Sequence, residues 1–269
     1  MLYEVLAASS QVRGIRGESH VLWEAFHPER APGWISQEIR PEEVTADERR
    51  FLYRTISMLT GDRRYLDKAP ANALRVPYLL SLFADARFVC IVRDGRAVIS
   101  SLLTGWRSND AMFPGKDLGR PLAIDGYGGG RWKFVVPSGW EAYTYGHSLV
   151  EVCAFQWSAS VEALEAGRAS VAAEGWLAVR YEDFVSDPVG QTTSFAGCLE
   201  LEPGAGLLYR SGALAQNVTK SITAPGSGKW RLEHAEEIER IAPSIAPLLR
   251  RLGYEPDIEP GPRRESSEP

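Results

Sequence analysis

The apolar positions of the chain fall into two patterns, short continuous runs and runs with helical spacing. A continuous apolar run lies at 88–92, and a second run, apolar up to its last residue Arg180, lies at 176–180. Runs of this length favour buried parallel strands. Apolar residues recur every three or four positions over 150–164 and again over 238–252, and this spacing predicts two amphipathic helices. From residue 88 onward the chain therefore alternates strands with helices.

The first half carries weaker signals. We predict helices over 1–9, 41–59 and 71–83, and a short strand over 11–14. The segment 108–146 is rich in glycine and aromatic residues and reads as one long irregular connection, which is typical of lids or binding loops. Strands alternating with helices predict an α/β fold built on a doubly wound parallel sheet.

Length and composition limit the possible classes of protein. The chain has 269 residues, of which 44% are hydrophobic, enough for one α/β core, and we expect a single domain over 1–258. The polar, proline-rich stretch 259–269 predicts a disordered tail. A net charge of −5 argues against nucleic-acid binding but allows a local basic pocket.

The same composition bears on location. No apolar run reaches the length of a membrane span, and no signal peptide is visible. The three cysteines, Cys90, Cys153 and Cys198, are scattered without metal-ligand spacing. We expect them to be buried free thiols, which indicates a protein of the reducing cytoplasm.

The first strand–helix junction carries the clearest chemistry. Arg93 follows the run at 88–92, Asp94-Gly95 makes the turn, and Ser101 comes about two helical turns later. Ligands of open α/β sheets bind at the carboxyl ends of strands. A guanidinium and a hydroxyl in that position suit a phosphate dianion. The common alternative for a single arginine is a surface ion pair.

Four short motifs resemble one family in the order in which that family carries them. RDGRAVISS at 93–101 resembles the 3′-phosphate motif of sulfotransferases that use 3′-phosphoadenosine 5′-phosphosulfate (PAPS). LDKAP at 66–70, VRYEDF at 179–184 and GSGKW at 226–230 resemble three further elements of it. The bacterial and tyrosylprotein types are the most similar. The resemblance implies a P-loop-type doubly wound parallel sheet flanked by helices.

One family element has no match. The phosphate-cradling loop, roughly Pro-x-Ser-Gly-Thr, should lie between the first strand and first helix, yet residues 1–8 already resemble that helix. We therefore expect this sequence to lack the first strand and the loop, and as it stands to be a poor enzyme. GSGKW is no substitute, because Trp230 and Thr223 replace two residues that a Walker A loop requires.

The resemblance also implies catalytic residues. Glu18 matches the catalytic glutamate of the tyrosylprotein type, which takes the proton of the acceptor hydroxyl. His20 is the rival base. Lys68 would stabilise charge on the leaving phosphate and sulfonate oxygens. The structural alternatives are a helix N-terminal glutamate, a packed histidine and a solvated lysine.

Further residues would hold the nucleotide. Lys220 and Lys229 lie in a glycine-rich loop that, by resemblance, covers its phosphates, and Lys229 is the better match. Tyr181 fits the residue near the adenine, or else a packed aromatic at a strand end. An arginine of the tyrosylprotein type falls on Gly105 here, and Arg107 is a candidate to replace it.

Together these residues predict a PAPS-dependent sulfotransferase acting on a hydroxyl of a small-molecule, carbohydrate or lipid acceptor. PAPS is the co-substrate, 3′-phosphoadenosine 5′-phosphate (PAP) is the product, and the resemblance implies no metal ion. One alternative is a catalytically inactive relative that binds nucleotide or serves as a scaffold. The other is a P-loop small-molecule kinase, which the lack of a Walker A loop disfavours.

Overall fold

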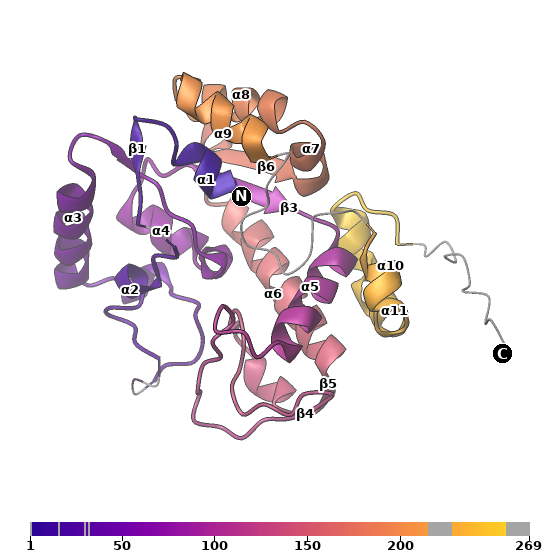
Figure 1. The fold of residues 1–269 in the computed structure, drawn as a ribbon. Helices are drawn as coiled ribbons and strands as arrows, with labels where there is room; N and C mark the ends of the chain where they lie inside the picture. Colours follow the sequence, from indigo (N-terminus) through magenta and orange to yellow (C-terminus); the bar gives the residue numbers. More distant parts are fainter. Residues whose placement is uncertain (1, 16, 30, 32, 215–227, 257–269) are drawn as a thin grey trace.

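The centre of the fold is a pair of parallel strands. The computed structural model of the protein describes residues 2–15, 17–29, 31, 33–214 and 228–256. In it β3 (Phe88–Val92) pairs in parallel with β6 (Trp176–Arg180), in a register that runs from Phe88↔Trp176 to Val92↔Arg180 (Figure 1). Both predicted strands are confirmed at their predicted bounds. Their carboxyl ends are level, so the residues that follow them start side by side.

The described strands form three parallel pairs. β1 (Val12–Arg13) pairs with β2 (Arg64–Tyr65), and β4 (Ala123–Asp125) pairs with β5 (Tyr145–Ser148). The predicted α/β class is confirmed, but no hydrogen bonds join these described pairs into one sheet. As a result the strands are less buried than a doubly wound sheet predicts, and Ile91 of β3 is 48% exposed.

Helices cover the strands in three groups, each with its own hydrophobic core. α5 (Gly95–Arg107), α6 (Leu149–Arg168) and α11 (Ala235–Arg251) share a core rich in tryptophan, with Trp106, Trp132, Trp140, Trp157 and Trp230. In Figure 1 α5 and α6 lie below β3 and β6.

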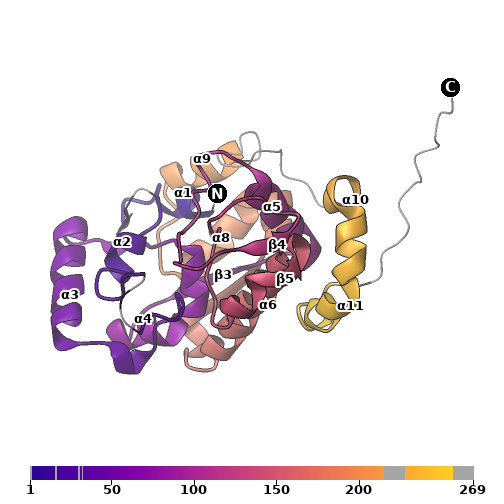
Figure 2. The same cartoon turned by 90° about the horizontal axis from the view of Figure 1, so that it is seen from below.

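The other two groups occupy different sides of the molecule. α1 (Leu2–Leu6), α8 (Pro188–Cys198) and α9 (Ala205–Leu214) pack with β6, and α8 and α9 lie above the central strands in Figure 1. The third core joins α2 (His20–Trp23), α3 (Ala46–Thr60) and α4 (Val76–Leu82). Figures 1 and 2 both place α3 and α11 at opposite ends of the molecule.

Two helices of the first half begin later than predicted. Residues Pro41–Glu43 form a 3-10 turn, and α3 starts only after Thr45. There the Thr45 side chain accepts a hydrogen bond from the Glu48 backbone N–H, while the Glu48 carboxylate accepts one from the Thr45 N–H. This capping box, and not the proline, fixes the start of the helix.

The predicted helix 71–83 is likewise divided. Pro70–Leu74 form a 3-10 turn, and α4 follows with Pro77 in its first turn. Proline fits there because the first N–H groups of a helix have no intrahelical partner. The remaining helical elements are α7 (Tyr181–Ser186), α10 (Trp230–Glu233), and 3-10 turns at Trp140–Tyr143 and Ala173–Gly175.

The segment 108–146 is mostly irregular, as predicted, and it packs on α5. The Lys133 ammonium is buried and donates to the carbonyls of Gly105 (3.0 Å) and Ser108 (2.5 Å) at the end of that helix. It therefore supplies a cation and hydrogen bonds to the carboxyl terminus of α5, where both stabilise a helix.

Cys90 and Cys153 are buried free thiols as expected, but Cys198 is exposed because it ends α8 on its solvent side. No helix among the described residues is long and apolar enough to cross a membrane. The cytoplasmic location stays a prediction. The predicted tail 259–269 lies outside the described residues.

Candidate active site

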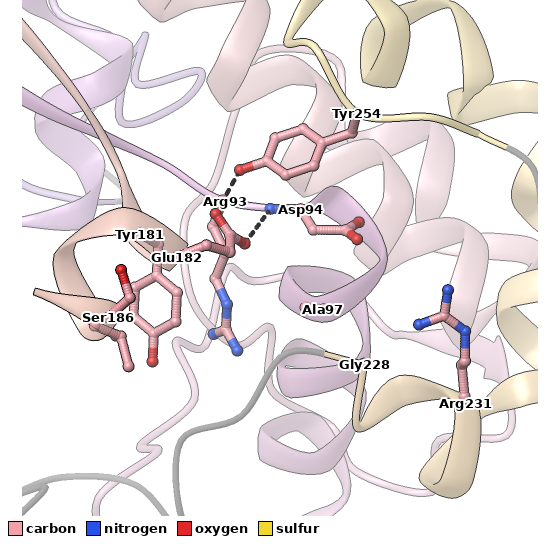
Figure 3. Close-up of a pocket in the computed structure, with 10 residues that line it drawn as sticks. Arg93, Asp94, Ala97, Tyr181, Glu182, Ser186, Gly228, Arg231 and Tyr254 are labelled. Carbon is pink, nitrogen blue, oxygen red and sulfur yellow. Dashed lines mark hydrogen bonds between the residues drawn. The ribbon is translucent and has the colours of Figure 1, made fainter.

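A pocket lies at the carboxyl ends of the central strands. Arg93 follows β3 and Tyr181 follows β6, and the Arg93 guanidinium carbon lies 4.3 Å from the centre of the Tyr181 ring. This is a cation–π contact between two side chains that the register brings together. The pocket measures about 540 Å³ and is lined by Arg93, Asp94, Ala97, Tyr181, Glu182, Val185, Ser186, Gly228, Arg231 and Tyr254 (Figure 3).

The turn after Arg93 is fixed by local hydrogen bonds and by packing. The Asp94 carboxylate accepts from the Arg96 backbone N–H (2.9 Å) and also pairs with the Arg96 guanidinium, so Asp94 caps α5. A Cβ at Gly95 would lie 2.3 Å from the Trp157 ring. Only glycine therefore lets α5 start this close to α6, which sets the direction in which Arg93 leaves the strand.

The carboxylates at the pocket are already engaged. Glu182 accepts one hydrogen bond from the Tyr254 hydroxyl (2.7 Å) and another from the Asp94 backbone N–H (3.3 Å), as Figure 3 shows. Burial and the bond to Glu182 raise the pKa of Tyr254, so its hydroxyl stays a donor at neutral pH. Glu182 thus ties together the ends of both central strands and the segment after α11.

The pocket carries free positive charge. Figure 3 shows Arg93 and Arg231 on the two sides of Ala97. Within the described part of the chain neither guanidinium has an ion-pair partner, although each contacts an aromatic ring, of Tyr181 and Trp230 respectively. Two unpaired guanidinium groups beside one cavity can hold an anion. Sequence reasoning named Arg93 but missed Arg231, which follows GSGKW directly.

Ser101 and Lys229 lie next to the pocket without lining it. Ser101 is exposed, one turn beyond the pocket residue Ala97, whose carbonyl accepts its hydroxyl at 2.9 Å. It is therefore on the predicted side of α5. Lys229 is half-buried beside Gly228. Lys220 lies outside the described residues. Arg107 forms a bidentate ion pair with Glu237 (2.6 and 3.0 Å), so its guanidinium is already occupied.

Apart from the pocket, a cluster of predicted catalytic residues lies where β1 and β2 end. A Cβ at Gly14 would lie 2.2 Å from the Leu66 carbonyl oxygen, so glycine permits the close approach of the two strand ends. Beyond them Glu18 binds two cations, Lys68 Nζ at 2.5 Å through Oε1 and His20 Nε2 at 2.7 Å through Oε2. Glu18 thus contacts both of the other predicted catalytic residues. None of them lines the pocket beside Arg93.

This contact determines the charge of each group. Burial acts to raise the pKa of Glu18, but hydrogen bonds from His20 and Lys68 and their charges outweigh it and lower that pKa to about 2. The hydrogen bond to Glu18 and the nearby Glu24 carboxylate raise the pKa of His20 to about 9. At neutral pH the cluster therefore holds a carboxylate and an imidazolium, and an imidazolium cannot accept a proton.

No group of three or more His, Cys, Asp or Glu side chains that could hold a metal occurs among the described residues.

Known proteins resemble the chain in sequence and in fold. Residues 1–126 match the model of a family described as the sulfotransferase family. Protein-tyrosine sulfotransferase A of Caenorhabditis elegans is 23% identical over 214 residues, covering 74% of this chain and 48% of the relative. Protein-tyrosine sulfotransferase 1 of Danio rerio is 23% identical over 208 residues, covering 72% and 49%.

The chain spans about half the length of these curated relatives. In fold, the crystal structure of sulfotransferase STF9 from Mycobacterium avium matches with a TM-score of 0.50 at 16% identity, covering 80% of this chain and 49% of that one. The fold is thus an α/β fold of the P-loop type. The chain is thus similar in sequence to sulfotransferases, and the resemblance that the motifs predicted is confirmed.

Proposed function

We propose that this chain transfers a sulfonate group from PAPS to a hydroxyl group of an acceptor. The observation that carries the proposal is the placement of two sets of residues at the ends of parallel strand pairs. Arg93 and Tyr181 follow β3 and β6, and Glu18 and Lys68 follow β1 and β2. The first set suits a nucleotide phosphate and base, and the second suits proton and charge transfer.

In this proposal Arg93 binds the 3′-phosphate of the donor with its paired N–H groups, and Ser101 adds a hydroxyl from the next turn of α5. The Tyr181 ring, which already contacts the guanidinium, offers a surface to the adenine. Arg231 adds a second cation across the pocket, and Lys229 and Lys220 complete the predicted set. PAPS supplies the sulfonate and leaves as PAP.

Glu18 is the proposed base. It takes the acceptor proton while the new S–O bond forms and the bond to the leaving phosphate breaks. Lys68 stabilises the charge on the leaving oxygen. To do so Lys68 turns from Glu18 toward the donor, and Glu18 then loses one of its two cations. Its pKa rises as a result, which makes it a stronger base when the donor is present.

The proposed acceptors include one more class of hydroxyl than the sequence predicts. The sequence predicts a hydroxyl of a small molecule, carbohydrate or lipid, and the relatives are named for protein tyrosine. We therefore include a tyrosine side chain as a second candidate acceptor, because Glu18 can deprotonate any of these hydroxyls in the same position.

Sulfonate transfer from radiolabelled PAPS to four acceptors tests the function: 4-methylphenol, an acidic tyrosine peptide, N-acetylglucosamine and dodecanol. We expect transfer to at least one. Glu18→Gln should then lower turnover about 10²–10⁴-fold and leave PAP affinity unchanged, because it removes only the proton acceptor.

Each alternative predicts a different result. PAP binding without transfer to any acceptor would identify an inactive nucleotide-binding relative. Phosphoryl transfer from ATP in the same assay would identify a kinase. A Glu18→Gln protein with wild-type turnover would remove Glu18 from the mechanism while leaving the function in place.

A further inference from the structure

The contacts of Glu18 continue into the interior of the protein as a row of alternating charges. Lys68, Glu18, His20, Glu24 and Arg75 follow one another, and their side chains go from 50% exposed at Lys68 to fully buried at Arg75. The His20 ring links the two carboxylates. Its Nε2 lies 2.7 Å from Glu18 Oε2, and its Nδ1 lies 3.4 Å from Glu24 Oε1.

Glu24 has fixed partners on its other side. Its Oε1 accepts a hydrogen bond from Gln37 Nε2 at 2.9 Å, and Arg75 Nη2 lies 3.7 Å away. Gln37 is buried and itself bound to Val136 through both its backbone N–H and its side-chain oxygen. The position of Glu24 is therefore set by the core of the protein and not by solvent.

Charge reinforces this arrangement. Burial acts to raise the pKa of Glu24, but His20, Lys116, Gln37 and Arg75 outweigh it and lower that pKa to about 2. Glu24 is therefore ionised at every pH at which the protein would work. The charged groups that face His20 are Glu18 and Glu24, with Lys68, Lys116 and Arg75 behind them. An imidazolium between two carboxylates is the stable state of this row.

We propose that Glu24 is a positioning residue for the reaction, acting through His20 to hold the Glu18 carboxylate in place. The proposal rests on the proposed function, in which Lys68 leaves Glu18 for the donor. His20 is then the one described cation still bound to Glu18, and only Glu24 fixes the far side of its ring. Without Glu24 the ring can turn, and Glu18 turns with it.

NMR titration of His20 measures the effect of Glu24 on His20 and does not require turnover. In the wild-type protein His20 should titrate near pH 9. Glu24→Gln should move its midpoint downward toward the ordinary value of about 6.5. The matched control is Glu38→Gln, because Glu38 is partly buried beside Gln37 and its carboxylate accepts a hydrogen bond from the Ser138 backbone N–H. Glu38 is not among the groups that shift the pKa of His20. The control should leave the midpoint near 9.

Turnover is measured on the same variants, with PAPS and the best of the four acceptors. Glu24→Gln should lower kcat about 10–100-fold while the KM for PAPS stays constant, because misplacement of a reacting group affects the chemical step. Glu38→Gln should leave both kcat and the KM for PAPS at their wild-type values. Unchanged kcat together with an unchanged His20 midpoint would overturn the proposal.

Glu24→Gln leaves Arg75 buried without its charge partner, so a second variant covers the case in which it does not fold. His20→Gln breaks the same link and leaves Glu24 and Arg75 paired. It should lower kcat by a similar factor, and full turnover in it would overturn the proposal. A wild-type protein that transfers sulfonate to none of the acceptors would instead overturn the proposed function, so the two failures are distinct.

Discussion

At the scale of single residues, Glu18 shows how neighbours decide the role of a carboxylate. It lies between Lys68 and His20, with Oε1 in contact with Lys68 and Oε2 in contact with His20. Both contacts keep it ionised, and the same contacts keep His20 protonated. A lone carboxylate at this position would have been an equally good helix cap, so its partners and not its location favour a role in proton transfer.

The pair also predicts how stability depends on pH. The folded protein raises the pKa of His20 from 6.5 to about 9, so its contribution is complete below pH 6.5 and is lost as the pH rises through 9. The pKa of Glu18 is lowered from 4.5 to about 2, so its contribution is complete above pH 4.5 and is lost as the pH falls toward 2. Stabilisation by this pair is therefore greatest between pH 4.5 and 6.5.

Urea denaturation at pH 6 and pH 9.5 measures this effect. The free energy of unfolding of the wild-type protein should be lower at pH 9.5 than at pH 6. The decrease should be smaller in the His20→Gln protein. His147→Gln is the control, because His147 contacts the exposed Glu151 at 3.9 Å and the Tyr143 ring but not the Glu18 cluster. The free energy of unfolding of this variant should decrease as much as that of the wild type. An equal fall in the wild-type and His20→Gln proteins would contradict the assigned charge state.

The residues that the sequence could not identify are those without a local pattern. Lys68 and Arg93 stand in motifs that resemble those of a family, and Glu18 matches that family's catalytic glutamate. Glu24 and Arg75 have no such context, and they meet only because α2 packs on the chain around α4. A contact of this kind depends on tertiary packing, which no spacing along the chain encodes.

At the scale of elements, continuous apolar runs are the most informative signal. They predict β3 and β6 at their observed bounds, although both strands are only partly buried and β6 ends on the exposed Arg180. The start of α3 is predicted too early, because a side-chain capping box at Thr45 decides it. The sequence predicts one doubly wound sheet, and the described strands join only in pairs.

The junction between β3 and α5 gives a prediction of its own. Gly95→Ala places a Cβ 2.3 Å from the Trp157 ring and should cost about 1–3 kcal/mol of stability through overpacking. Gly197→Ala is the matched control, since Gly197 is helical and exposed, and nothing lies within 4 Å of the position that its Cβ would take. The control should be neutral or gain up to about 1 kcal/mol from helix propensity. Urea denaturation curves with equal midpoints for the two variants would contradict the packing argument.

At the scale of the whole molecule, parallel pairing explains why residues far apart in sequence meet. Arg93 and Tyr181 follow strands whose last residues are in register, and Glu18 and Lys68 follow a second parallel pair. Each contact follows from two strands that point the same way and end together. Strand ends thus gather both proposed halves of the active site, while the three hydrophobic cores hold the pairs in place.

Calorimetric titration with PAP tests the central claim, that the pocket beside Arg93 binds the nucleotide. Arg93→Ala should weaken binding by about 1.5–3 kcal/mol, or roughly 10–150-fold in Kd, because it removes charge-assisted hydrogen bonds to a phosphate. Arg107→Ala is the matched control, since Glu237 already holds that guanidinium, and it should bind PAP as the wild type does. An Arg93→Ala protein with wild-type affinity for PAP would contradict the account.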